Sequence, residues 1–190
     1  MKVEIMNKYE FVLRFKLPED NGDPESFLDA LYENGCDDAV IGTGLSGCIG
    51  LDFYREANTA IDAVKTAVHD VKTAIPNVQL IEVAPDLLNT TELADLISSR
   101  IKKITRQAMR KYTQNHVEKV ISRFPIAAIT STSPLWHADE VTEWLINNEK
   151  ASGPEAEILI ETSKAARLFN HKLQAHKLAN DLTPLESISF

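Results

Sequence analysis

The 190-residue chain is poor in cysteine and contains no long apolar run. Its two cysteines, Cys36 and Cys48, are too few for a disulfide framework, and we expect them as small apolar residues on strands or in a loop. Because no run of about 18 apolar residues occurs, we expect no membrane span. The opening residues MKVEIMNKYEF include acids and lack a long apolar stretch, which argues against a signal peptide. These absences favour a soluble, cytoplasmic protein with no membrane partner.

The usual motifs of metal sites and catalytic centres are also missing. Neither H-E-x-x-H nor C-x-x-C occurs, and the five-residue spacing of His171 and His176 does not place them on one helix face. Cys36 and His69 are a nucleophile and a base, but nothing in the sequence brings them together. The tract GTGLSGCIG contains a loose G-x-G-x-x-G, yet a strand follows it where a dinucleotide site needs a helix. We therefore expect a glycine-rich hairpin there, no enzyme, and no metal or cofactor.

One basic window stands out in this acidic chain. The whole chain carries a net charge of −8, whereas residues 100–123 hold eight basic residues and one acidic residue, a net charge of +7. A polyanion is repelled by an acidic surface and attracted to a concentrated basic one, so this pattern is typical of a nucleic-acid site. The basic residues are Arg100, Lys102, Lys103, Arg106, Arg110, Lys111, Lys119 and Arg123.

The first 86 residues predict the order β-α-β-β-α-β. Residues 8–17 alternate as a half-buried strand does, with Tyr9, Phe11, Leu13, Phe15 and Leu17 on the apolar face. A helix from Pro24 to Gly35, strands in DDAVIGTG and GCIGLDFYRE, a helix over 57–74 and a strand in VQLIEVA follow. The stripe of the second helix is Ile61, Val64, Ala67, Val68 and Val71. This order predicts a ferredoxin-like domain, and its net charge of −9 indicates that it does not bind DNA.

Helical patterns with short links follow Pro85-Asp86. LNTTELADLIS predicts a helix capped by Asn89 or Thr90, and ITRQAMRKYTQ a second one capped by Thr105. In the second helix Ala108, Met109 and Tyr112 are expected to pack inward. FPIAAITSTSPLW predicts two short strands around a turn, and HADEVTEWLINN a helix in which Trp144, like Trp136 before it, serves packing. A last helix is expected over 155–180.

Two linked helices, of which the second is basic on its outer face, indicate a helix-turn-helix. The second helix, residues 105–113, would enter the major groove with its N-terminal end at the base edges. Arg106 can bond guanine and Gln107 can bond adenine, each through two hydrogen bonds, and Arg110 can reach a base or a phosphate. The hairpin that follows would be a wing. The expected DNA-binding residues are Arg100, Lys102, Lys103, Thr105, Arg106, Gln107, Arg110, Lys111, Ser131 and Thr132, with Ser133 near them.

The segments NTTELADLI, ITRQAMRKY, FP and SPLWHADEVTEWL resemble the helix-turn-helix and wing of the bacterial MerR and AlpA/excisionase-like regulators. In that group an L-x-E-[IL]-A-x-L-L helix precedes a V-[ST]-R-Q-x-[VI] recognition helix, and W-x-x-x-E-V-x-x-W-L follows the wing. The similarity covers residues 87–146 and implies DNA binding and gene regulation. The segment DDAVIGTGLSGCIGLDFYREA resembles a domain that precedes such modules in bacterial DNA-binding proteins.

The link before Thr105 departs from that pattern, since it is longer than the usual short turn. Either the first helix continues through Arg100-Ile101, or the turn is a loop. The approach angle of the second helix and the roles of Arg100, Lys102 and Lys103 depend on which of these holds.

The sequence thus predicts an α+β chain in three parts. These are a ferredoxin-like domain (1–84), a winged helix-turn-helix domain (85–149) and a C-terminal helix (150–190) that could serve oligomerisation. We expect a sequence-specific, autoregulatory transcriptional regulator that binds double-stranded DNA as a homodimer. One alternative is an antitoxin-like protein whose acidic N-terminal domain binds a partner protein encoded nearby. The other is an excisionase-like DNA-bending factor.

Overall fold

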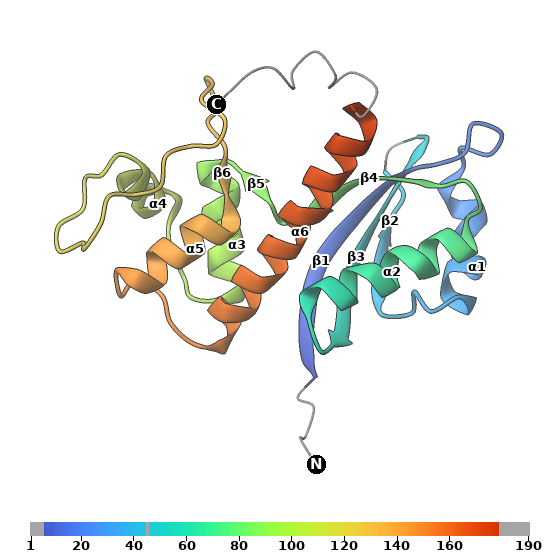
Figure 1. The fold of residues 1–190 in the computed structure, drawn as a ribbon, viewed down its shortest axis with the longest axis horizontal. Coiled ribbons are helices and arrows are strands. Elements are labelled where there is room, and N and C mark those ends of the chain that lie inside the picture. The colour runs from blue at the N-terminus through green and yellow to red at the C-terminus, as the bar shows by residue number, and fades with distance from the viewer. Residues whose placement is uncertain (1–5, 45, 179–190) are drawn as a thin grey trace.

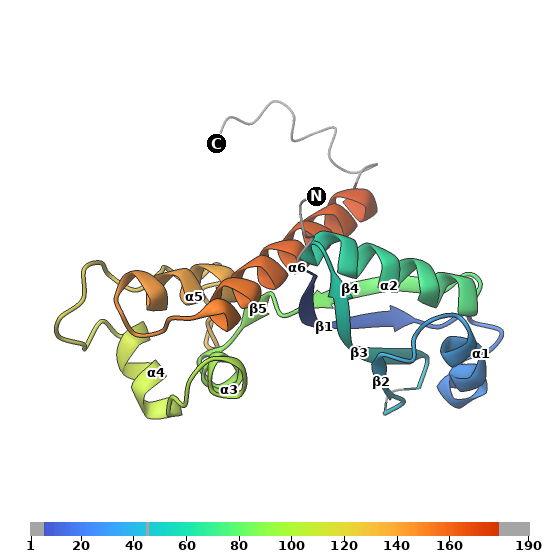
Figure 2. The same ribbon diagram turned by 90° about the horizontal axis from the view of Figure 1, so that it is seen from below.

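The computed structural model describes residues 6–44 and 46–178. Three predicted segments lie partly outside the described residues. They are the N-terminal segment that argues against a signal peptide (residues 1–5), the glycine-rich hairpin (Leu45) and the C-terminal part (residues 179–190). The described chain is a mixed α+β protein in which a four-stranded antiparallel sheet and a group of helices lie side by side along the longest axis (Figure 1). Its helices α1 and α4 lie at opposite ends of that axis (Figures 1 and 2).

The sheet has the strand order β2-β3-β1-β4, with every neighbouring pair antiparallel. Its strands are β1 (Asn7–Lys16), β2 (Ala39–Gly42), β3 (Cys48–Ala57) and β4 (Gln79–Ala84). The alternation predicted for the first strand is confirmed, because its five apolar residues are all buried while Arg14 and Lys16 are exposed. On the exposed side Arg14 pairs with Glu82 of β4.

The first predicted helix is split into two short pieces. Pro24–Phe27 is a 3₁₀ turn (η1), and α1 is Leu28–Glu33, which leaves Leu28 37% exposed instead of on the apolar face. The helix ends before Gly35, whose φ of +87° suits glycine and whose added Cβ would meet Asp70 at 3.4 Å. The second helix, α2 (Ala60–Ala74), starts later than expected because Thr59 caps it. Ile61, predicted on its apolar stripe, is 38% exposed, and Ala60, Ala63 and Ala74 are buried in its place.

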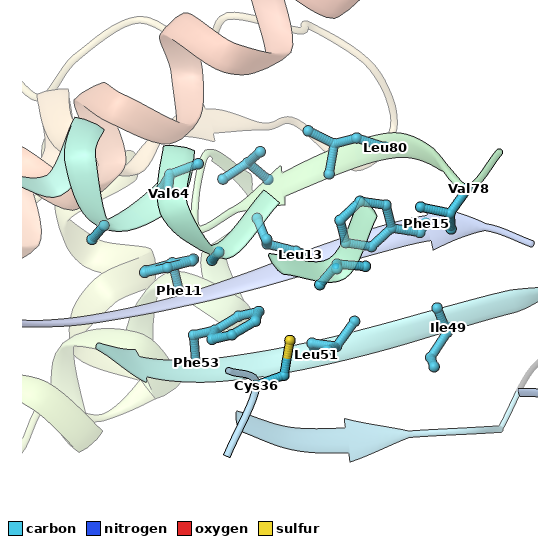
Figure 3. Packing of buried hydrophobic residues seen from close by; sticks show 14 of the residues in the cluster. Phe11, Leu13, Phe15, Cys36, Ile49, Leu51, Phe53, Val64, Val78 and Leu80 are labelled. Atoms are coloured by element: carbon cyan, nitrogen blue, oxygen red, sulfur yellow. The ribbon is translucent and has the colours of Figure 1, made fainter. Parts of the chain in front are cut away.

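The first hydrophobic cluster fills the space between the sheet and its helices. Phe11, Leu13 and Phe15 of β1 lie in this cluster with Val64 of α2 and Leu80 of β4 (Figure 3). The rings of Phe11 and Phe53 stack with centroids 5.4 Å apart. Cys36 lies in a loop and Cys48 on a strand, and both are free thiols, as the sequence indicated.

The second half of the chain is built around a separate hydrophobic cluster that contains Trp136 and Trp144. It comprises β5 (Leu87–Leu88), α3 (Thr90–Arg100), α4 (Arg106–Thr113), β6 (Trp136–His137) and α5 (Ala138–Asn147). Both tryptophans are buried, as expected.

The predicted pair of strands in FPIAAITSTSPLW is wrong. In the described structure this hairpin is reduced to one bridge between Ile129 and Leu135. Trp136 continues instead into β6, which pairs with β5, and its indole donates a hydrogen bond to Pro125 O at 3.0 Å. The second predicted strand therefore pairs with β5, the strand that precedes α3, instead of with the first half of the hairpin.

The last helix, α6 (Pro154–Leu178), crosses between the two halves (Figures 1 and 2). Ala165 and Ala166 pack in the first cluster, while Leu159 packs in the second. The Asn170 side chain forms hydrogen bonds with both the N–H and the C=O of Val83. It therefore pairs the backbone polar groups of that residue on the outer edge of β4. The role of residues 150–190 in oligomerisation stays a prediction, but much of this helix is engaged within its own chain. No helix of the described residues could cross a membrane.

Candidate nucleic-acid interface

Helix α3 begins at a complete capping box. Asn89 Oδ1 accepts hydrogen bonds from the N–H groups of Thr91 and Glu92 at 2.9 and 3.1 Å, and the Glu92 carboxylate accepts one from Asn89 N at 2.9 Å. Asn89 is thus the cap among the two candidates. The helix buries Leu93, Ala94 and Ile97 and continues to Arg100, so the first of the two alternatives for the long link holds.

The link between α3 and α4 is folded back on α3 by one hydroxyl group. Ser98 Oγ donates to Ile104 O at 2.7 Å and accepts from Ile104 N at 3.0 Å. Ile101 and Ile104 pack against the second cluster, whereas Lys102 and Lys103 are exposed. The extra residues therefore form an ordered turn that presents two lysines. Ser98 was not predicted from the sequence, because its role depends on a partner six residues away.

Helix α4 presents a polar face and buries one side. Thr105 caps it by accepting a hydrogen bond from Ala108 N at 3.1 Å. Met109 is fully buried and the ring of Tyr112 lies 5.3 Å from that of Trp144, so both pack inward as expected. The exposed residues of this helix are Arg106, Gln107, Arg110 and Lys111.

Arg106 is held by a carboxylate from the preceding helix. Its Nε and Nη2 donate to the two oxygens of Asp95 at 3.2 and 2.8 Å. The hydrogen bond and the negative charge of Asp95 raise the pKa of Arg106. Both side chains are more than half exposed, so the pair lies on the surface of the α3–α4 unit.

Arg100, expected to contact phosphate, points elsewhere. Its Nη1 donates to Glu10 O at 2.7 Å and its Nε lies 3.2 Å from Glu10 Oε2, on the first strand of the sheet. Its side chain is only 18% exposed, and burial lowers the pKa of Arg100 although Glu10 opposes the shift. Arg100 therefore docks α3 on the sheet, and we leave it out of the candidate surface. The other seven basic residues of the 100–123 window are all exposed.

The hairpin tip carries the remaining predicted residues. Ser131, Thr132 and Ser133 are exposed. Ser131 Oγ donates to Ser133 O at 2.8 Å and accepts from Ser133 N at 3.2 Å, which closes the tip. Within the described residues, the hydroxyls of Thr132 and Ser133 make no hydrogen bond, because Ser133 takes part in the turn only through its backbone.

The long connection from α4 to the hairpin is ordered by side chains that bond its backbone. Asn148 accepts from Ile121 N and Ser122 N, and Asn115 accepts from Phe124 N. The indole of Trp144 donates to Ser122 O. Neither asparagine was predicted from the sequence. Asn115 follows α4 and has a φ of +54°, a left-handed conformation that asparagine adopts more readily than most residues. An asparagine at the end of a predicted helix was therefore the one local signal in the sequence.

The candidate surface therefore comprises α4 and the link with Lys102 and Lys103, and the hairpin tip is an exposed segment further along the chain. Within the described residues no group of three or more His, Cys, Asp or Glu side chains could hold a metal ion. Comparisons of the chain with protein-family models, curated proteins and solved structures found no match. The geometry of the site is therefore the basis for interpreting it.

Proposed function

We propose that this protein is a sequence-specific regulator that binds double-stranded DNA and inserts α4 into the major groove. The observation that carries the proposal is the division of α4 into two faces. Met109 anchors one face in the core, while Arg106, Gln107, Arg110 and Lys111 are exposed on an otherwise acidic protein. Arginine and glutamine have the donor and acceptor geometry that matches guanine and adenine edges.

We also propose that the chain combines a ferredoxin-like domain with a winged helix-turn-helix domain. The order β5, α3, α4, hairpin, β6, α5 fits a winged helix-turn-helix whose hairpin forms a minimal wing. The element order β-α-β-β-α-β with strand order β2-β3-β1-β4 fits a ferredoxin-like domain. Both agree with the proposed relationship to MerR and AlpA/excisionase-like regulators.

The lysines of the link would position the protein without reading sequence. Lys102, Lys103 and Lys111 are exposed and near the start or the outer face of α4, where phosphates flank the groove. Removing one lysine that binds a phosphate makes the slope of log K against log salt shallower by about 0.9. In this proposal the exposed Thr132 at the hairpin tip would contact the backbone or the minor groove. Homodimeric binding to two half-sites and autoregulation remain part of the proposal.

Selection from random duplexes, followed by binding titrations at two salt concentrations, tests this function. We expect Arg106→Ala and Gln107→Ala to lose sequence preference, and Lys102→Ala with Lys103→Ala to reduce the salt slope by about two. Lys65→Ala is the matched control, because Lys65 is an exposed lysine on α2 far from the basic window. Alanine keeps helix propensity in α4, so the fold should persist.

Other outcomes favour other functions. Unchanged sequence preference in both the Arg106 and Gln107 variants would overturn the assignment of α4 as the recognition helix. A co-purified partner protein that is retained when α4 and the link are neutralised would favour the antitoxin-like alternative. Bending of the selected duplex in a gel-phasing assay would favour the excisionase-like factor.

A further inference from the structure

Asp95 occupies one particular edge of the Arg106 guanidinium. The carboxylate accepts from Nε and from Nη2 at 3.2 and 2.8 Å, so it faces the side of the guanidinium that carries Nε. Asp95 belongs to α3 and Arg106 to the first turn of α4, eleven residues further along the chain. Within the described residues Nη1 of Arg106 has no hydrogen-bond partner.

This arrangement leaves the outer edge of the guanidinium available. A guanidinium has five N–H groups, and the Asp95 carboxylate uses two of them. The two on Nη1 and the second one on Nη2 remain. One N–H from each of these nitrogens forms a parallel pair, which matches the O6 and N7 acceptors of guanine.

We propose that Asp95 is a positioning residue that holds Arg106 in the orientation needed to read a guanine in the major groove. This inference rests on the proposed DNA-binding function and adds its specificity: one G·C pair in the bound site is read through the α3–α4 pair. A long arginine side chain loses rotamer freedom when it binds a base. Pairing with Asp95 restricts the rotamers of Arg106 before DNA binds. The contact with the base then costs less conformational entropy, and Arg106 can adopt fewer alternative contacts with other bases.

The charge of Asp95 makes the proposal distinguishable from simple electrostatics. A carboxylate near DNA repels phosphates, so its removal should strengthen sequence-independent binding slightly. Its removal should at the same time weaken discrimination at the guanine. A residue that merely neutralised Arg106 would shift both kinds of binding in the same direction. Opposite changes in the two quantities therefore identify a positioning role.

The experiment compares Asp95→Ala and Asp95→Asn with wild type on the duplex selected by the wild-type protein. Affinity is measured for that duplex, for duplexes with each G·C pair replaced, and for one with 7-deazaguanine, which lacks the N7 acceptor. We expect both variants to reduce discrimination at one guanine about tenfold and leave other positions unchanged. In an Arg106→Ala background, Asp95→Ala should change discrimination no further. Glu118→Ala is the control, because it removes an exposed acid from the same basic window.

The outcomes separate this inference from the function on which it rests. If sequence preference depends on Arg106 yet Asp95→Ala keeps it intact, Asp95 has no positioning role and the DNA-binding function stands. If Glu118→Ala lowers discrimination as much as Asp95→Ala does, charge alone explains the effect and the inference fails. If the wild-type protein shows no sequence preference, the proposed function fails first. Thermal unfolding of each variant confirms that differences in binding do not come from an unfolded chain.

Discussion

Arg55 shows how much one buried side chain organises around itself. Its guanidinium donates to Asp38 through two nitrogens, to Asp70 and Thr66 through Nη1, and to Gly35 O through Nη2, at 2.6–3.2 Å. The side chain is only 9% exposed, and its partners come from the loop after α1 and from α2. The residue thus joins the central strand β3 to two elements that cover the sheet.

Replacing Arg55 should therefore destabilise the fold strongly. We expect Arg55→Ala to lower the free energy of unfolding by about 3 kcal/mol, because it leaves two largely buried carboxylates without a counter-charge. Arg55→Lys keeps the charge but lacks the planar fork, so it should fall between alanine and wild type. Denaturant unfolding measures both. Equal stability of the lysine variant and wild type would show that charge alone matters at this site.

The two cysteines should differ sharply in reactivity. Burial, together with the charge of Asp70, raises the pKa of the Cys36 thiol to about 11, and this residue is 2% exposed. Since the thiolate is the nucleophile, about one Cys36 in a thousand is reactive at pH 8. We expect iodoacetamide to label Cys48 first in the folded protein, and Cys36 labelling to speed up as the pH rises toward 11. Peptide mapping by mass spectrometry checks this, and similar labelling rates at pH 8 would contradict it.

At the scale of elements, α3 has two neighbours with different roles. Leu93, Ala94 and Ile97 of this helix pack in the second cluster, and its last residue, Arg100, bonds Glu10 on β1. We expect Arg100→Gln to lower the free energy of unfolding by about 1–3 kcal/mol, because the Glu10 groups lose a charged donor. The salt dependence of DNA binding should not change.

Lys103→Gln is the matched comparison for Arg100→Gln. Lys103 is exposed in the link after α3, so its removal should leave thermal stability unchanged and reduce the salt slope by about one. Thermal denaturation and binding titrations on the same two variants measure both quantities. A lower salt slope for Arg100→Gln and an unchanged one for Lys103→Gln would contradict this prediction and indicate that Arg100 contacts phosphate.

At the scale of the whole molecule, α6 couples the two hydrophobic clusters. The Glu161 carboxylate of this helix accepts hydrogen bonds from Tyr9 Oη and from Ala60 N, both at 2.9 Å. It therefore links α6 to β1 and to the first turn of α2. Asn170 bonds Val83 and also donates to Asp86, whose other oxygen lies 2.6 Å from His137 Nδ1. Elements of both halves thus share partners along one helix.

This coupling predicts one unfolding transition. Both tryptophans lie in the second cluster, so fluorescence reports that cluster, whereas far-ultraviolet circular dichroism reports the whole chain. We expect the two denaturation curves to coincide. Phe53→Ala, in the first cluster, should lower the stability by about 3–5 kcal/mol and move the fluorescence curve equally. A fluorescence midpoint that does not respond to Phe53→Ala would mean that the halves unfold independently.

Local patterns in the chain were sufficient for the elements whose causes are local. The alternation in β1, the cap at Thr105 and the burial of Met109 follow from neighbours within a few residues, and the structure has all three. Hydrophobic periodicity works there because burial is decided by which face an element presents. The seven exposed basic residues were recognisable for a similar reason, since charge is a property of composition.

Long-range interactions decided the rest. Arg100 has the same local appearance as Lys102, but Glu10, ninety residues away, accepts its hydrogen bond and removes it from the surface. Likewise β6 pairs with Leu87 and Leu88, although the sequence predicted that it would pair within the hairpin. Asp95 binds the guanidinium of Arg106 and so sets its orientation. A hydrogen bond between distant residues forms only when packing brings both elements together. Neither partner alone carries a signal of it, so the arrangement of the site became visible in the folded chain.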